Sequence, residues 1–168
     1  ATYFNEQINN LIVTVFSPIE TEQNIGSAHI QGVETELTLH PTRWLLVDAT
    51  YTYTQPENAD TGELLLRRPQ NAASLNVALT PIPHLTIAPE LLFTGAFHDF
   101  LIDNNGISTG AIGTSGQGLL FNLTATYDVT RRIELYATGR NLFGSRFEPV
   151  NGFQTPGPNF FAGVRVRL

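Results

Sequence analysis

Apolar and polar residues alternate with a period of two along most of the chain, which is the pattern of β-strands whose two faces meet different surroundings. In the stretch 44–54, every second position from Leu45 to Tyr53 is apolar or aromatic, and the positions between them include Asp48 and two Thr residues. The same alternation recurs in 71–80, 119–128, 133–140 and 160–168. No long window carries an apolar stripe of helical period. The pattern predicts an all-β chain.

The alternating stretches predict about eight strands. They cover residues 2–16, 26–40, 43–55, 68–80, 84–97, 118–128, 132–142 and 157–168. Several exceed the usual soluble strand of about 5–6 residues. They match the roughly 9–11 residues that a tilted strand needs to cross a bilayer.

The connections between these strands alternate strictly between short and long. The breaks near 40–43, 80–84 and 128–132 are short, whereas those near 17–25, 56–67, 98–117 and 143–156 are long and rich in Gly, Asn, Pro and Ser. Outer-membrane barrels place short turns at the periplasmic end and long loops at the extracellular end. The sequence therefore predicts up-and-down antiparallel strands of a transmembrane β-barrel. A soluble β-sandwich would require the alternation of loop lengths to be accidental.

Charge separates the two faces of the strands. The apolar faces of the five clearest runs contain no Asp, Glu or Arg. Polar lumens and apolar outer surfaces produce this division in membrane barrels. The candidate lumen-facing residues are charged: Glu34, Glu36, Asp48, Glu90, Glu134, Arg140, Arg165 and Arg167. The net charge of −6 argues against a nucleic-acid partner.

Sites for covalent chemistry or bound metals are not indicated. The chain has no Cys, and its four His residues lack metal-ligand spacing. The stretch Asp103–Gly106 is rich in oxygen ligands but lacks the spacing of a calcium loop. The stretch Gly113–Gly116 lacks the strand-to-helix setting of a nucleophile elbow. We expect no enzyme activity, no cofactor and no metal site, and we interpret Arg67 and Arg68 as solvated charges or phosphate partners.

Four segments carry a resemblance to a known family. They follow one another along the chain: 24–34 with Gly32-Val33-Glu34, 64–69 with Arg68-Pro69, 139–158 with Asn141-Leu142-Phe143, and 161–168. The last resembles the terminal strand signal of bacterial outer-membrane proteins, carried here by Gly163, Val166 and Leu168. Those chains usually end in an aromatic residue, from which Leu168 departs. In their order, the four segments resemble TonB-dependent outer-membrane receptors.

The resemblance implies a location in the bacterial outer membrane and a barrel of about 22 strands around a plug domain. At about 21 residues per strand, such a wall needs about 460 residues. Residues 1–168 are therefore expected to be the C-terminal portion of the barrel, with the plug domain and the N-terminal strands absent. The implied function is TonB-dependent uptake of a scarce nutrient such as a metal–siderophore complex or cobalamin.

The resemblance also implies the partners. They are outer-membrane lipid, a plug domain, the TonB protein and an extracellular small-molecule ligand. The eight charged candidates then either contact the plug or line a wet lumen, and the sequence leaves both readings open. It also leaves open a complete eight-stranded barrel with a structural or adhesion role. The many small inward positions suit a wide wall better than a narrow, side-chain-filled barrel.

Overall fold

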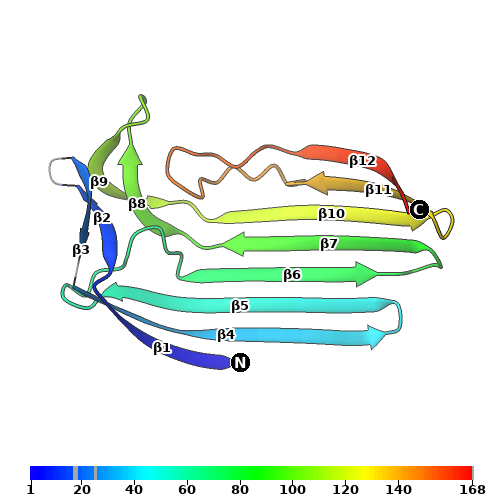
Figure 1. Cartoon of the computed structure of the whole chain (residues 1–168), viewed down its shortest axis with the longest axis horizontal. Helices are drawn as coiled ribbons and strands as arrows, with labels where there is room; N and C mark the ends of the chain where they lie inside the picture. Colours follow the sequence, from blue (N-terminus) through cyan, green and yellow to red (C-terminus); the bar gives the residue numbers. More distant parts are fainter. Residues whose placement is uncertain (17–18, 25, 168) are drawn as a thin grey trace.

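The computed structural model describes residues 1–16, 19–24 and 26–167, and its main element is one antiparallel sheet of eight strands (Figure 1). The strands of this sheet, in spatial order, are β1 (Thr2–Asn9), β4 (Ser27–Thr42), β5 (Leu45–Asn58), β6 (Asn71–Leu79), β7 (Leu85–Thr94), β10 (Gly118–Asp128), β11 (Ile133–Arg140) and β12 (Asn159–Val166). Among the described residues, no helix is long and apolar enough to cross a membrane. The predicted all-β, up-and-down architecture is confirmed.

The two ends of the sheet differ as the loop lengths predict. The connections β4–β5, β6–β7 and β10–β11 are short and lie at one end, which we call the short-turn end. The other connections lie at the opposite, long-loop end (Figure 1). Strands β1 and β12 form opposite edges of the sheet and do not pair with each other within the described residues. The sheet is thus an open wall, which argues against a closed barrel of eight strands.

Two hairpins at the long-loop end correct the sequence prediction. One joins β2 (Ile12–Phe16) to β3 (Glu20–Asn24), and the other joins β8 (Phe97–Ile102) to β9 (Ser108–Ser115). The single strand expected over 2–16 is wrong, because β1 ends at Asn9 and Asn10 adopts a φ of 59°. The loops expected over 17–25 and 98–117 are also wrong in their described parts. Within the described residues, the strands of each hairpin pair with each other and not with the eight-stranded sheet.

The strand register collects the predicted apolar positions on one face. One row of paired residues across five strands is apolar: Leu37, Ala49, Leu75, Leu91 and Phe121. The adjacent row, which points to the other face, is polar: Thr38, Asp48, Asn76, Glu90 and Asn122. Because side chains alternate across a pleated strand, one register fixes both faces.

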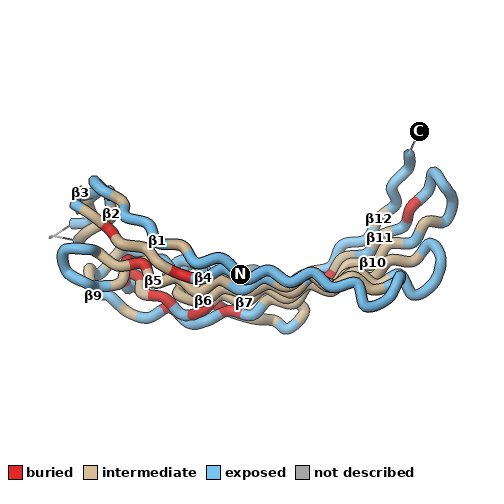
Figure 2. The backbone as a smooth tube through the Cα atoms, turned by 90° about the horizontal axis from the view of Figure 1, so that it is seen from below, coloured by how far each residue is buried: buried red, intermediate tan, exposed pale blue. Residues whose placement is uncertain are grey.

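The sheet is a single curved layer with little core (Figure 2). Its accessible surface is 11001 Å², against roughly 8,200 Å² expected for a compact chain of this mass. The buried hydrophobic residues are few: Ala28, Leu65, Phe97, Phe100 and Phe147. On the apolar face, Leu37 is 49% and Val164 60% exposed. An uncovered apolar face of this extent requires a nonpolar surrounding, which a bilayer supplies.

Candidate functional site

The eight charged candidates share the polar face of the sheet, but only some of them lie together, and the lumen-facing role remains a prediction. Glu34 faces Thr52 across the β4–β5 ladder, and Glu36 faces Thr50. Asp48 accepts a hydrogen bond of 2.7 Å from Thr38. Glu90 accepts one of 2.7 Å from the Asn122 amide. These carboxylates are therefore spread over the wall, and hydroxyl or amide neighbours partner two of them.

Three of the candidates form a cluster at the short-turn end. Arg165 and Arg167 both donate to the Glu134 carboxylate, the latter at 2.7 Å. Glu134 is 7% exposed, whereas the two arginine side chains are 59% and 58% exposed. The register also places Asp128 opposite Glu134, so two guanidinium groups and two carboxylates lie near one another at this end of the polar face. Arg140, the remaining candidate, lies over the Phe161 ring at 5.7 Å.

Gly163, one of the three residues of the terminal strand signal, has a packing role. The Tyr136 ring lies directly over Gly163, where a Cβ atom would collide with it. Val166 pairs with Ile133 on the apolar face and is 61% exposed. Leu168 lies outside the described residues. Whether these positions act as a signal remains a prediction.

An ion pair between the buried Asp99 and the partly exposed Arg67 ties together three segments of the long-loop end. Asp99 of β8 is fully buried and accepts 2.8 Å hydrogen bonds from Arg67 Nε and from the Phe100 amide. Its second oxygen accepts from the Asn151 amide at 3.0 Å. The Arg67 amide in turn donates to the His98 carbonyl at 2.8 Å. Three of these hydrogen bonds, two from Arg67 and one from the Asn151 amide, thus fasten the 59–70 connection and the 141–158 connection to the β8–β9 hairpin.

Asn141 organises the last long connection from within. It adopts a φ of 49°, which Asn tolerates better than most residues. Its buried side-chain amide donates to the carbonyls of Ser145 and Pro156 and accepts from the Ser145 amide. Phe147 then packs over Gly118, at a place where any side chain would collide with the ring. The connection is therefore built as a fixed structure.

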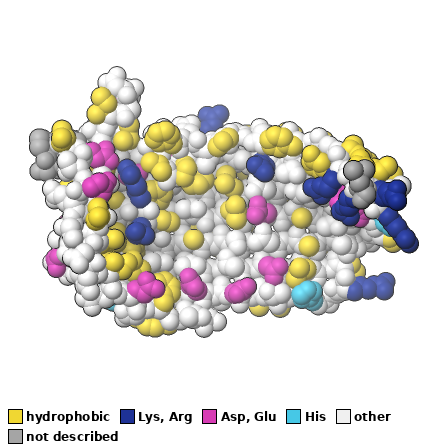
Figure 3. All heavy atoms as spheres, viewed as in Figure 1, with side chains coloured by type: hydrophobic (Ala, Val, Ile, Leu, Met, Phe, Trp, Pro, Cys, Tyr) yellow, Lys and Arg dark blue, Asp and Glu magenta, His cyan; other side chains and the backbone are white. Residues whose placement is uncertain are grey.

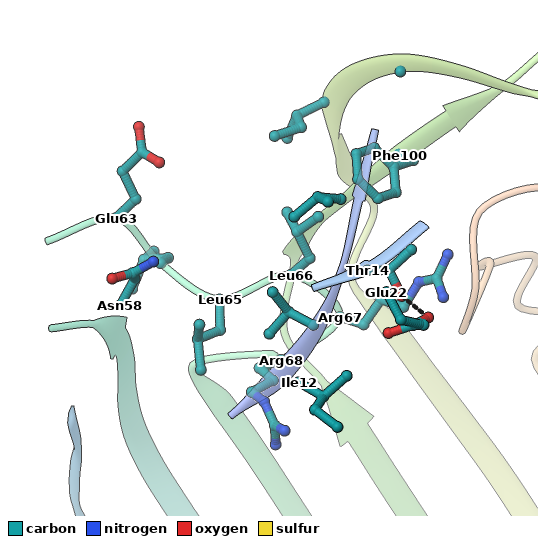
Figure 4. A pocket seen from close by; sticks show the side chains of 15 residues that line it. Ile12, Thr14, Glu22, Asn58, Glu63, Leu65, Leu66, Arg67, Arg68 and Phe100 are labelled. Carbon is teal, nitrogen blue, oxygen red and sulfur yellow. Dashed lines mark hydrogen bonds between the residues drawn. The ribbon is translucent and has the colours of Figure 1, made fainter. Parts of the chain in front are cut away.

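A cavity of about 600 Å³ opens between the two hairpins and the 59–70 connection (Figure 4). Ile12 and Glu22 line it from the first hairpin, Leu66 and Arg67 from the connection, and Phe100 from β8. Its volume falls within the range of roughly 300–1,000 Å³ typical of small-molecule sites. The mixed lining can surround an apolar group while charged side chains contact polar ones.

The Asp103 carboxylate closes the β8–β9 hairpin. It accepts backbone hydrogen bonds from Asn105 at 2.8 Å and from Ile107 at 2.9 Å. The Ile107 and Asn105 hydrogen bonds hold the pKa of Asp103 below its usual range. A lowered pKa means that this stabilisation is present at neutral pH and is lost as the pH falls through the folded-state pKa. The described residues contain no group of three potential metal-ligating side chains.

We expect Asn141→Ala to destabilise the 141–158 connection by about 2 kcal/mol, because buried backbone groups lose their partners. Faster hydrogen exchange at the Ser145 and Thr155 amides would report the opening. Asn141→Gly is the matched control: it also loses the amide but accepts positive φ, so it should cost about 1 kcal/mol less than the alanine variant. Equal exchange in wild type and the alanine variant would contradict this role.

The fold and the distribution of side chains define the class of protein. A single curved antiparallel sheet, apolar on one face and polar on the other, with short turns at one end, is part of the wall of an outer-membrane β-barrel. The sequence model of the family "TonB dependent receptor-like, beta-barrel" matches residues 1–142. The chain belongs to this family, as the resemblance predicted.

Solved structures share the fold at low sequence identity. The ferripyoverdine receptor of the outer membrane of Pseudomonas aeruginosa matches with a TM-score of 0.75 and 18% identity, over 98% of this chain and 24% of that one. The siderophore receptor PiuA from Acinetobacter baumannii gives 0.72 and 18%, over 98% and 25%. The copper transporter OprC gives 0.77 and 19%, over 98% and 27%. The chain thus spans about a quarter of the length of these proteins.

The sequence identified parts of the long-loop end without connecting them. From the sequence, Arg67 stood out as a charged loop residue, but its pairing with Asp99, 32 residues away, was not predicted. Arg67, predicted to be a solvated charge or a phosphate partner, pairs with the buried Asp99 while its own side chain stays 42% exposed. A clue was available, since a lone Asp between the aromatic residues of a strand requires a partner once it is buried.

Proposed function

We propose that the protein containing this chain is an outer-membrane receptor that takes up a metal–siderophore complex with energy delivered through TonB. The observation that carries the proposal is the long-loop end, where the Asp99 network holds two connections and a hairpin beside a cavity of about 600 Å³. Fixed loops around a cavity reduce the ordering cost of binding. Family membership and the functions of the structural neighbours, a ferripyoverdine receptor and a copper transporter among them, support the metal cargo.

Residues 1–168 would then be the C-terminal part of the barrel, and a plug domain would meet the polar face. The Glu134 cluster supports such contact, because its two arginine side chains are more than half exposed on this face. Acidic groups of a plug would fit these exposed guanidinium groups. The alternative is that these residues are solvated in a water-filled lumen. The other charged residues of the polar face are further candidates for plug contact: Glu34, Glu36, Asp48, Glu90 and Arg140.

The transport proposal is tested with intact cells and defined ferric siderophores, one of the hydroxamate and one of the catecholate type. We expect cells that express the whole protein to bind and import at least one probe. In cells without TonB, surface binding should persist while import stops. Import that continues without TonB, or the absence of binding to both probes and to copper, would overturn the proposal.

The role of the cavity is tested with a matched pair of substitutions. Ile112 lines the cavity, whereas Ile107 lies at the tip of the same hairpin and is 63% exposed. Ile112→Trp should weaken probe binding by at least about tenfold, equivalent to about 1.4 kcal/mol. Ile107→Trp should leave it unchanged. Equal effects of the two changes would remove the cavity from the proposed site while leaving the transport assignment intact.

A further inference from the structure

The three short turns repeat one combination of side chains. Each carries an exposed large hydrophobic residue beside a basic or imidazole side chain: Trp44 beside Arg43, Ile82 near His84, and Val129 near Arg131 and Arg132. The hydrophobic residues are 44%, 55% and 49% exposed. In turns that face only water, three such residues in three turns would be costly. At a membrane surface, apolar side chains reach the acyl boundary while cations meet the headgroups.

The turns contain no compensating negative charge. Residues 43–44, 80–84 and 129–132 include no Asp or Glu. The ion pairs formed within the described residues do not include Arg43, Arg131 or Arg132. The nearby Asp128 faces Glu134 in the register and therefore belongs to the polar face. These three guanidinium groups are thus exposed and available to an anion.

Charge is distributed unevenly between the ends of the wall. Of the nine arginines in the sequence, five lie at the short-turn end: Arg43, Arg131, Arg132, Arg165 and Arg167. Figure 3 shows arginine side chains gathered at this end. Two of the five are engaged by Glu134. The surplus of positive charge sits at the turns, where a barrel wall meets the lipid headgroups.

We propose that this rim, defined by Arg43, Trp44, Ile82, His84, Val129, Arg131 and Arg132, binds anionic phospholipid headgroups of the periplasmic leaflet. A guanidinium donates two parallel hydrogen bonds to a phosphodiester. A headgroup with surplus negative charge, such as phosphatidylglycerol, is favoured over a zwitterionic one. Four strand spacings separate the first and third turns, about 19 Å. The rim therefore holds separate lipids at Arg43 and at the Arg131–Arg132 pair.

The test uses the whole protein that contains this chain, exchanged from detergent into vesicles. One set consists of phosphatidylcholine alone, a second of equal parts phosphatidylcholine and phosphatidylglycerol, and a third of phosphatidylcholine with lipid A. Native mass spectrometry then counts the lipids that stay bound. We expect selective retention of phosphatidylglycerol, lost at high salt. The triple variant Arg43→Gln, Arg131→Gln, Arg132→Gln should lower the affinity by about fivefold at the Arg43 site and about 25-fold at the Arg131–Arg132 site, from roughly fivefold per arginine.

The matched control is Arg146→Gln, which removes an exposed arginine from a long connection. It should leave phosphatidylglycerol retention unchanged. If this control lost as much phosphatidylglycerol per arginine removed as the triple variant does, net charge alone would explain the effect and the proposal would be overturned. A preference for lipid A, or equal retention of zwitterionic and anionic lipid by the wild type, would overturn it as well. Heat-dependent electrophoretic mobility verifies that each variant is folded, and lipid retention is compared only among folded variants.

Discussion

Replacing Leu75 by Arg is expected to destabilise the folded barrel by about 2–4 kcal/mol, the cost of a cation on the lipid-facing side near the bilayer midplane. Leu75 lies at the centre of β6, and its register partners on the apolar face are Ala49 and Leu91. No acidic side chain shares that row. The guanidinium would therefore meet acyl chains without a partner, and water would reach it only through a distorted bilayer.

Asn76→Arg is the matched control in the adjacent position of the same strand. Asn76 lies on the polar face between Asp48 and Glu90, so an arginine there meets two carboxylates. Equilibrium unfolding by guanidinium from phospholipid vesicles measures both changes in the whole protein. The control should shift the free energy of unfolding by less than about 1 kcal/mol. If both variants lose the same stability, the assignment of the two faces is wrong.

Replacing Asp99 by Ala is expected to open the long-loop end at a cost of about 3 kcal/mol. The carboxylate is fully buried, and its removal leaves the amides of Phe100 and Asn151 without acceptors. The Arg67 side chain is 42% exposed and can be solvated by water once Asp99 is gone. The expected loss of stability is therefore at the lower end of the roughly 3–5 kcal/mol typical of broken buried ion pairs. Hydrogen exchange at these amides and at Arg67 should accelerate by about a hundredfold.

Two controls separate the loss of the network from a general loss of folding. Asp103→Ala removes an exposed carboxylate at the tip of the same hairpin and should affect only the turn from Asp103 to Ile107. Exchange in the central strands β6 and β7 should stay at its wild-type rate in both variants. Protection of the 59–70 and 141–158 connections that survives Asp99→Ala would show that other contacts hold them.

The apolar face and the Asp99 network, which the two predictions test, were not equally predictable from the sequence. The apolar row containing Leu75 was readable from alternation, because the side-chain period of a strand is fixed by its backbone. The strict order of short and long connections identified the two ends of the wall. Those signals are local and required no knowledge of which strands pair. The loops and the hairpins within them were read less well, since β3 carries Asn and β9 carries Gly and Ser, which also suit turns.

The sequence by itself determined the all-β class, the apolar and polar faces and the two kinds of connection, because each depends on neighbours within a few residues. The tertiary structure decided which distant side chains meet. Asp99 joins Arg67 and Asn151 across 32 and 52 residues, and Glu134 collects Arg165 and Arg167 across a hairpin. Such contacts depend on the strand register and on the paths of the long connections. A long connection can join its two strands in many backbone conformations, and side-chain packing selects one of them. The single-layer wall could therefore be predicted from local sequence patterns, whereas the network that holds the long-loop end beside its cavity could not.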